Sequence, residues 1–588
     1  MARPSSISSP MSRIATHLRT QAQDGSMPWM PCRAGILRQG RASHVAKRQC
    51  LNHLVPNDVK ATRPPAIQTS CRAIALNVFS PRKTCTSGKK GFQKGIAANA
   101  HSFAPRVLRG RDTSDLQMAF PECMPPSRRI AMRAAIRLSF LVASQLCFSV
   151  AIAEQPPLPD PDWGGVGSDS TVYVGFNLIS NAYDRGAYAA LVLPDGKLVM
   201  AGLAITDNTP TAIYDIGIVR LEASSGAPDT SFGGGDGRMN LGLASSSVQS
   251  AEVVLDPGDK LMVSAMQTNS SAVLVRLADN GSFDPSFDGD GKKFISAGNF
   301  LDGNSQLSGT PIVLPQANGK YLVIANAYRE SPQLLLCIGM IRLNSNGSID
   351  ASFAAGTGRI CEAPPYETLN AAQGLALIVN NQGDLLIAGA AYHSGSAVWD
   401  MSVLKLSAEG QRDSTFGEDG WAFVPFDEGG NLIDYANAIS VDGQERIVIG
   451  GSASVGSNET SAAVARLTSS GQIDSSFAQN GKILLDLGPI SAYSTFSVAR
   501  IAIADSGRLL LGGRAEEGSF LAMLANDGAF DPGFGSDGRF LSTRGTSEDM
   551  IWSGDYVYSV GSGTNPASNR TEFAASRRII PLFHAGFE

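Results

Sequence analysis

The chain has 588 residues and a formal net charge of -5, and this charge is unevenly divided. Residues 1–131 carry 21 basic and 5 acidic side chains, a net of +16, which leaves 27 basic and 48 acidic side chains, a net of -21, for residues 132–588. The strong negative charge of residues 132–588 argues against nucleic acid as a partner of this part of the chain. The length allows several domains or one large all-β domain.

The first 131 residues are rich in Arg, Ser and Pro and have no sustained apolar periodicity. This composition predicts a basic, disordered extension. The alternative is an arm that binds nucleic acid, which the basic stretch at residues 81–94 would suit.

A secretory signal peptide is predicted over residues 132–153. Two arginines begin it, residues 138–150 are apolar, and Ala-Ile-Ala ends it as a cleavage site. A membrane span is the alternative, but the apolar run of 16 residues to position 153 is shorter than the roughly 20 that a spanning helix needs. We therefore expect a secreted, periplasmic or cell-surface protein without a stable membrane span. A signal at this position also predicts that translation starts near Met132, with residues 1–131 an artefact of the assigned start.

One short motif recurs six times after the signal, as in "PDTSFGGGDGR" at residues 228–238. Its phenylalanines are separated by 55, 66, 63, 61 and 57 residues. They are Phe232, Phe287, Phe353, Phe416, Phe477 and Phe534. A fixed period of about 60 residues is typical of repeat architectures.

Each repeat contains four segments that read as strands. In the first repeat these are "AYAALVL" (187–193), "KLVMAG" (197–202), "GIVRL" (217–221) and "RMNLGL" (238–243). A tight Asp-Gly turn joins the first two, as in a hairpin. Repeated four-stranded antiparallel sheets indicate a β-propeller.

The two ends of the repeat region complement each other. Residues 160–169 resemble the end of a repeat, with Trp163 at the phenylalanine position, and residues 171–178 read as a fourth strand. Residues 549–563 and 573–582 can supply the three missing strands. The sequence therefore predicts an all-β, seven-bladed propeller over residues 160–582. One of its blades is shared between the N- and C-terminal ends, and a tail follows at 583–588.

The pairing of "DGKLVMAG" with "RL...G..DTSFG..G" over residues 160–540 resembles the delta-60 repeat family of bacterial exported proteins. This resemblance implies a propeller-like fold with no assigned biochemical activity. The sixth repeat departs from the pattern, since Met523 replaces the basic residue before the leucine.

The motif has two interpretations. Asp229 and Asp236 offer carboxylates for an ion, whereas the alternative has Phe232 packed between blades, Asp229 capping the turn and glycines at positive φ. A basic residue stands eight or nine positions before the motif Asp in five repeats, a spacing that predicts an ion pair across the hairpin. These pairs are Arg220 with Asp229, Arg276 with Asp284, Arg342 with Asp350, Lys405 with Asp413 and Arg466 with Asp474.

Alternation of strand direction puts the Asp-Gly turns and the motif loops on one face and the irregular loops on the other, variable face. Four residues of those loops could contact a glycan or protein partner, or form solvated loop tips: Tyr328, Arg329, His393 and Trp399. Four acids just before the first strands could bind Ca²⁺, or instead accept hydrogen bonds from backbone amides of their own blades: Asp184, Glu367, Asp434 and Glu548.

Two cysteines follow the signal, Cys337 and Cys361, and in an exported protein they suggest one disulfide, with two buried thiols as the alternative. Only two histidines follow it, and no motif of a hydrolase or nucleotide-binding site is present. Apart from the candidate Ca²⁺, no cofactor is expected. The sequence therefore favours a monomeric binding or structural scaffold for an unknown protein or glycan. A carbohydrate-active hydrolase or lyase with a carboxylate pair on the variable face is the alternative.

Overall fold

The computed structural model describes residues 157–580. Within this range it leaves out 165–169, 180–182, 208–211, 244–246, 332–333, 365–369, 394–397, 427–432, 457–458, 489–494, 516–517 and 543–545. The predicted basic extension, the signal peptide and the C-terminal tail lie outside the described residues. Within those residues, no helical segment has the length and hydropathy of a membrane span.

The described part is all-β and consists of sets of antiparallel strands that pair in chain order, except in the sheet that combines the two ends. The first sheets are β3 (Gly186–Val192), β4 (Leu198–Asp207), β5 (Ile213–Leu221) and β6 (Arg238–Asn240), followed by β7 (Val248–Leu255), β8 (Leu261–Gln267), β9 (Ala272–Leu277) and β10 (Lys292–Ile295). Next come β11 (Ser305–Pro315), β12 (Tyr321–Arg329), β13 (Leu335–Leu343) and β14 (Arg359–Glu362), with β15 (Asn370–Val379), β16 (Leu385–His393), β17 (Val398–Leu406) and β18 (Trp421–Val424). A short parallel pairing of β13 with β15 joins these two sets of strands.

Two further sheets follow the same pattern: β19 (Tyr435–Val441), β20 (Ile447–Gly456), β21 (Glu459–Leu467) and β22 (Lys482–Leu484), then β23 (Phe496–Ile503), β24 (Leu509–Ala515), β25 (Gly518–Leu524) and β26 (Arg539–Ser542). The last sheet combines both ends of the described chain: β27 (Thr546–Ser553), β28 (Tyr556–Asn565) and β29 (Arg570–Ile579) with β1 (Leu158–Pro159) and β2 (Thr171–Val174). The short helical turns η2 (Ala297–Asn299) and α4 (Phe353–Gly356) lie in connections.

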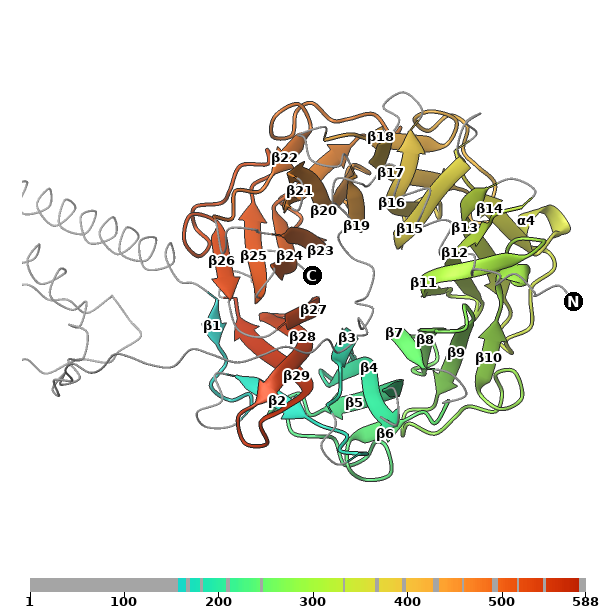
Figure 1. Cartoon of the computed structure of the whole chain (residues 1–588). Helices are drawn as coiled ribbons and strands as arrows, with labels where there is room; N and C mark the ends of the chain where they lie inside the picture. The colour runs from blue at the N-terminus through green and yellow to red at the C-terminus, as the bar shows by residue number, and fades with distance from the viewer. Residues whose placement is uncertain are drawn as a thin grey trace, which may run out of the picture. The chain divides into compact units, whose positions relative to one another are not determined.

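The sheets are arranged around a ring, with the first strand of each nearest the centre and the last at the rim (Figure 1). The first strands contact one another in the order β3, β7, β11, β15, β19, β23 and β27, and β27 contacts β3. Both β1 and β2 pair with β29, so the beginning and the end of the described chain belong to one sheet.

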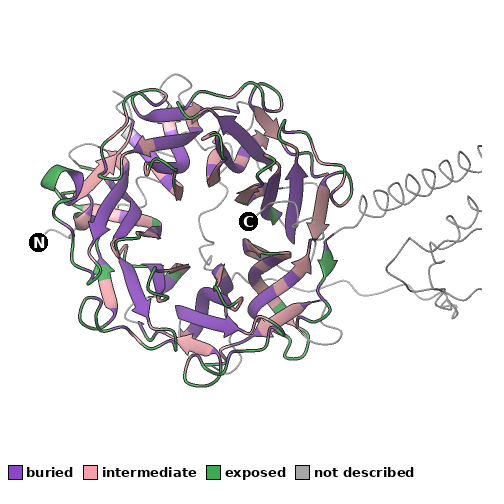
Figure 2. Ribbon diagram, turned by 180° about the vertical axis from the view of Figure 1, so that it is seen from behind, coloured by how far each residue is buried: buried purple, intermediate pink, exposed green. Residues whose placement is uncertain are grey.

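The core lies between neighbouring sheets, where the middle strands are buried along most of their length (Figure 2). The six motif phenylalanines and Trp163 are each at most 1% exposed. Each is a large apolar side chain removed from water where two sheets meet, which stabilises the packing by roughly 1.5–3 kcal/mol per ring. The recurrence of the motif phenylalanine therefore reflects the packing of one sheet on the next.

The irregular loops expected on the variable face, among them residues 203–216, 327–336 and 390–400, are shorter in the structure. β4 extends to Asp207, β12 to Arg329 and β16 to His393, so much of each segment continues the hairpin. The reason is that the first residues of each segment are apolar and stay buried, through Ile205, Tyr328 and Ala391, so they continue the strand.

Candidate functional site

The motif Asp is the centre of an ion-pair network on the face of the Asp-Gly turns. In the first sheet Arg220 Nε lies 2.6 Å from Asp229 Oδ2, and both side chains are 2% exposed. Lys197, which follows the Asp-Gly turn, places its Nζ 2.9 Å from the same oxygen. The guanidinium also lies over the ring of Phe232, 4.8 Å from its centroid. The ion pair expected from spacing thus forms, and it includes a second cation.

The network recurs in the other sheets. The guanidinium or ammonium lies 2.6 to 3.0 Å from the motif carboxylate in Arg276–Asp284, Arg342–Asp350, Lys405–Asp413 and Arg466–Asp474. The turn lysine contributes again in the second and third sheets, as Lys260–Asp284 at 2.6 Å and Lys320–Asp350 at 2.8 Å. The motif therefore serves the same local role many times.

Burial by itself would raise the pKa of Asp229. The hydrogen bonds from Lys197, Ser231 and Arg220 outweigh burial and hold the pKa well below its usual range. For Asp350 the hydrogen bond from Lys320 is the largest cause of a similarly lowered pKa. These carboxylates are therefore ionised in the folded chain at neutral pH.

In two sheets the motif carboxylate pairs with a basic residue that the sequence analysis did not identify. In the sixth repeat Met523 stands at the basic position, and Arg508 of the preceding turn reaches Asp531 instead, at 2.5 Å. In the sheet of the two termini, Arg577 Nη2 lies 2.6 Å from Asp160 Oδ2 and the guanidinium covers Trp163 at 4.3 Å. The tetrapeptide "DPDW" and the arginines of "RRII" were the available signals.

The fourth repeat differs from the others. Asp384 stands at the position of the turn lysine, and Lys405 Nζ lies between two carboxylates, 3.1 Å from Asp384 and 3.0 Å from Asp413. A pocket of about 260 Å³ opens beside Lys405, toward Glu445 and Ser469 of the next sheet. Neither Glu445 nor Ser469 was singled out from the sequence.

The three candidate Ca²⁺ ligands that the structure describes, Asp184, Asp434 and Glu548, do not share one site. The carboxylate of Asp184 accepts hydrogen bonds from the amides of Phe176 and Ile205 at 2.9 and 3.2 Å. Burial raises the pKa of Asp184, and these hydrogen bonds oppose the rise.

Asp434 accepts hydrogen bonds from the amides of Phe426 and Ser454 in the same way, and Glu548 forms an ion pair with Arg514 at 2.5 Å. Glu367 lies outside the described residues. Among those residues, no group of three or more His, Cys, Asp or Glu side chains is placed to hold a metal ion.

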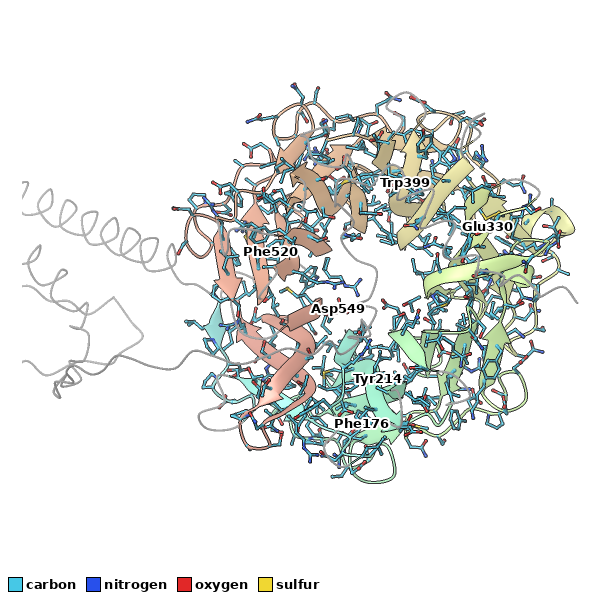
Figure 3. The ribbon with its side chains drawn as sticks, in the orientation of Figure 1. Phe176, Tyr214, Glu330, Trp399, Phe520 and Asp549 are labelled. Carbon is cyan, nitrogen blue, oxygen red and sulfur yellow. A yellow bond between two sulfur atoms is a disulfide. The ribbon has the colours of Figure 1, made fainter. Side chains whose placement is uncertain are left out.

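The four candidate ligand-binding residues lie at strand ends rather than at loop tips, which corrects their expected placement. Tyr328 and Arg329 end β12; the ring of Tyr328 is buried, and its hydroxyl donates to Gln306 Oε1 at 2.6 Å. Arg329 Nη1 donates to the carbonyl of Asp302 at 3.3 Å. Trp399 lies in β17 and is half-buried (Figure 3). His393 ends β16, and its side chain is not among those that the structure describes.

Charged side chains of three first strands meet near the centre of the ring. Arg500 of β23 forms a two-point ion pair with Asp549 of β27, at 2.9 and 3.0 Å, and Asp549 also accepts the amide of Ala190 in β3 (Figure 3). Burial among protein atoms raises the pKa of Glu252 in β7 to about 7, and Arg500 opposes this rise. These contacts connect the terminal sheet with both of its neighbours.

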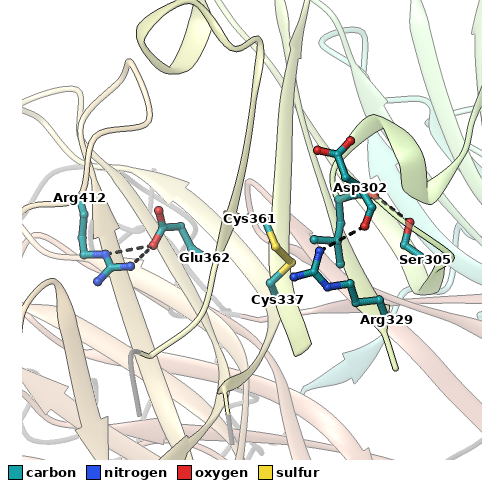
Figure 4. Close-up of a disulfide and its surroundings, with 8 residues drawn as sticks. Asp302, Ser305, Arg329, Cys337, Cys361, Glu362 and Arg412 are labelled. Atoms are coloured by element: carbon teal, nitrogen blue, oxygen red, sulfur yellow. Dashed lines mark hydrogen bonds and ion pairs between the residues drawn. A yellow bond between two sulfur atoms is a disulfide. The ribbon is translucent and has the colours of Figure 1, made fainter. Parts of the chain in front are cut away.

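Cys337 and Cys361 form a disulfide with a Cα–Cα distance of 5.4 Å (Figure 4). It links β13 to β14, next to the pairing of Gly339 with Cys361. In the first sheet Asp215 stands at the position of Cys337, and its carboxylate accepts the amide of Leu243 after β6 at 2.7 Å. The same place between third and fourth strands is thus joined covalently in one sheet and by hydrogen bonds in another.

A family model described as "Domain of unknown function (DUF5122) beta-propeller" matches residues 193–232, 316–353 and 446–477. Each matching segment ends on a motif phenylalanine and includes the second and third strands and the ion-paired Asp, and the first two segments also include the turn. The fold and these segments together define a β-propeller repeat protein.

Several solved structures are similar to the chain. A protein of unknown function from Dyadobacter fermentans has 13% identity and a TM-score of 0.32, over 70% of this chain and 98% of its own. The β-propeller domain of the Trilobed protease from Pyrococcus furiosus has 11% identity and a TM-score of 0.36, over 69% and 98%. The α-L-arabinanase of Penicillium chrysogenum, complexed with arabinobiose, has 12% identity and a TM-score of 0.32, over 67% and 94%. No conclusion about activity follows from likeness at these values, and no curated protein sequence matches the chain.

Proposed function

We propose that the chain is an exported β-propeller of seven blades, closed by a blade shared between its two ends, that acts as a binding or structural scaffold. Contacts between the first strands run from β3 to β27 and return to β3, which supports a closed ring. The pairing of β1 and β2 with β29 supports the shared blade. Closure leaves no open sheet edge for aggregation.

Export is supported by the predicted signal at residues 132–153 and by the Cys337–Cys361 disulfide. Disulfides form and persist in oxidising compartments such as the periplasm or the cell exterior. The delta-60 resemblance points in the same direction, since that family consists of exported proteins.

The observation that carries the scaffold proposal is the repeated use of the motif charges. Arg220 with Asp229, and the equivalent pairs in other sheets, hold hairpins together beside a buried aromatic ring. Residues committed to the same contact in sheet after sheet favour a rigid platform over a unique reactive centre. A rigid ring can present the hairpin ends of the variable face to a protein or glycan partner.

The test uses protein that begins at Glu154, applied to a glycan array and, in parallel, to a reducing-sugar release assay on any glycan that it retains. We expect retention without release. A Trp399→Ala variant, assayed beside the parent, tests whether retention depends on the variable face. Trp399 is half-buried in β17 and lies outside the motif networks, so the variant leaves those networks intact. Release of reducing ends at a rate proportional to enzyme concentration would overturn the scaffold proposal in favour of a hydrolase or lyase.

A further inference from the structure

The pocket beside Lys405 occupies a position that other sheets fill with their own guanidinium group. Arg220 Nη1 donates to the carbonyl oxygen of Asp279 in the next sheet at 2.5 Å. Arg276, Arg466 and Arg577 make the equivalent bond, at 2.5 or 2.6 Å, to the carbonyls of Ser345, Asn526 and Ala223. Each acceptor is the second residue after the leucine that ends the third strand of the following sheet.

Ser469 is the second residue after Leu467, so its carbonyl is the acceptor that this pattern assigns to the fourth repeat. Lys405 does not reach it, because its ammonium is held between Asp384 and Asp413. No donor to the Ser469 carbonyl is found among the described residues. A lysine in place of arginine therefore leaves space at this junction of two sheets.

The wall of the pocket carries two charged side chains, Lys405 and Glu445. Asp384 and Asp413 hold the ammonium of Lys405 at 3.1 and 3.0 Å and more than balance its charge, which leaves the carboxylate of Glu445 as an acceptor on the wall. The first repeat, in contrast, has Lys197 and Arg220 around Asp229. The fourth repeat thus lacks the positive charge that the same position carries elsewhere.

Glu445 is itself held in an unfavourable backbone conformation, with φ of +61°. Glycine occupies the equivalent turn position in other repeats, as Gly196, Gly319 and Gly507, and Asp259 stands there in the second repeat with φ of +57°. A side chain at such a position costs conformational energy, and strain of this kind gathers at functional sites. Its carboxylate accepts a hydrogen bond from Asn381 of the neighbouring sheet, which fixes it at the pocket.

We propose that this pocket binds a guanidinium group that comes from outside the chain. The group would take the place that the chain's own arginines take elsewhere, donating to the Ser469 carbonyl and to the Glu445 carboxylate. A planar guanidinium, with its fixed fork of donors, suits this pair of acceptors better than an ammonium ion. The volume of about 260 Å³ lies below the roughly 300–1,000 Å³ of sites for drug-sized ligands, which suits one small group.

The binding experiment titrates the chain from Glu154 onward, in low salt, with blocked amino acids: N-acetyl-arginine amide, N-acetyl-lysine amide and the neutral isostere N-acetyl-citrulline amide. We expect the arginine probe to bind with a Kd at least tenfold lower than either of the others, measured by calorimetry. Equal Kd values for arginine and citrulline, or for arginine and lysine, would overturn the proposal. A pentapeptide with a central arginine, compared with agmatine, distinguishes a protein source of the group from a small guanidino compound.

The decisive variant is Lys405→Arg, which supplies the pocket with the chain's own guanidinium, as in the neighbouring sheets. We expect this variant to fold and to raise the Kd for the arginine probe at least tenfold, and Glu445→Gln to weaken binding as well. Lys320→Arg is the matched control, because Lys320 pairs with Asp350 of another sheet and does not line the pocket. Undiminished binding by the Lys405→Arg variant would refute the site. The site lies on the face of the turns, so its failure would leave the scaffold proposal untouched.

Discussion

At the residue scale, the repeated contact between a motif carboxylate and one or two cations explains most of the sequence pattern. The pairing of Arg220 with Asp229 was predictable from spacing alone, because two residues on adjacent segments of one hairpin meet across it. The contribution of Lys197 was not predictable in the same way. It belongs to a different hairpin, 32 residues before Asp229, and only the folded sheet brings the two together.

Replacement of Asp229 by Asn should lower the free energy of unfolding by about 3 kcal/mol at pH 7, because it removes the buried counter-charge of Arg220 and leaves it only the exposed carboxylate of Asp279, at 2.7 Å. The measurement is chemical denaturation. Asn keeps the size of the side chain, so a cavity does not contribute. Asp236→Asn is the control, since Asp236 is exposed and pairs only with the partly exposed Arg238.

The same carboxylates determine how stability depends on pH. Their pKa values are lower in the folded chain than in the unfolded chain, where Asp titrates near 3.9. Their contribution is therefore complete above that pH and is lost as the pH falls below about 4. Denaturation midpoints measured from pH 7 to pH 2 should fall steeply below pH 4 for the parent protein and less steeply for Asp229→Asn; parallel curves would contradict this account.

The sixth repeat offers a matched comparison of the two cations. Arg508 is the basic partner of Asp531, since Met523 occupies the arginine position, whereas Asp229 keeps Arg220 when Lys197 is removed. We expect Arg508→Ala to cost about 2 kcal/mol of unfolding free energy and Lys197→Ala less than about 1 kcal/mol. Thermal unfolding of the two variants side by side measures the difference, and a larger loss for Lys197→Ala would contradict the assignment of Arg508.

At the element scale, a bulge in the first strand explains the glycine that ends the sequence "KLVMAG". The register of β15 on β16 shifts between Gly374 and Ala376, and a Cβ on the facing Gly389 would lie 1.8 Å from the carbonyl oxygen of Gln373. Gly202, Gly451 and Gly513 face the same carbonyl in their sheets, at 1.8 to 2.2 Å. The second sheet has Ala265 at this position, and the bulge in its first strand lies two residues nearer the start of β7, between Val248 and Ser250.

Gly389→Ala should therefore destabilise the protein by more than about 2 kcal/mol, because the carbonyl that it meets belongs to the backbone and has no free space to move into. Gly443→Ala is the control, since a Cβ there meets nothing within 4 Å and its backbone is not left-handed. Differential scanning calorimetry on both variants should give a clearly lower Tm for the first only. A Gly389→Ala protein with the parent Tm would show that the bulge can move, as it has in the second sheet.

Strands and turns leave a pattern in the sequence, whereas a pocket between two sheets does not. Strand type and hairpin turns were predictable, since "KLVMAG" and "GIVRL" carry apolar runs bounded by turn residues. The pocket beside Lys405 was not, because it depends on which atoms of Arg220 cross to the next sheet, and hydrophobic periodicity does not report such contacts. A comparison of the arginine position across repeats would have singled out Lys405, although not the hollow that results.

At the scale of the whole molecule, the relation between the two ends is the feature on which the proposed ring depends. Trp163 was predictable as an equivalent of the motif phenylalanines, and it is fully buried. The sequence did not predict that Arg577 would complete this copy of the motif by pairing with Asp160 and covering Trp163. These contacts join segments more than 400 residues apart, so their loop-closure entropy is compensated only when the intervening sheets have formed.

A chain that ends at Met550 tests the proposed closure. It lacks β28 and β29, so β1 and β2 lose their pairing partner, and Trp163 loses Tyr558 and Arg577. We expect this truncated protein to expose sheet edges and apolar surface, to associate on size-exclusion chromatography, and to unfold over a broader denaturant range than the parent. Removal of residues 581–588 alone is the control and should leave the transition unchanged, because it keeps every described strand. A Met550 truncation that remained monomeric, with the parent midpoint and slope, would show that the first six sheets are stable without closure.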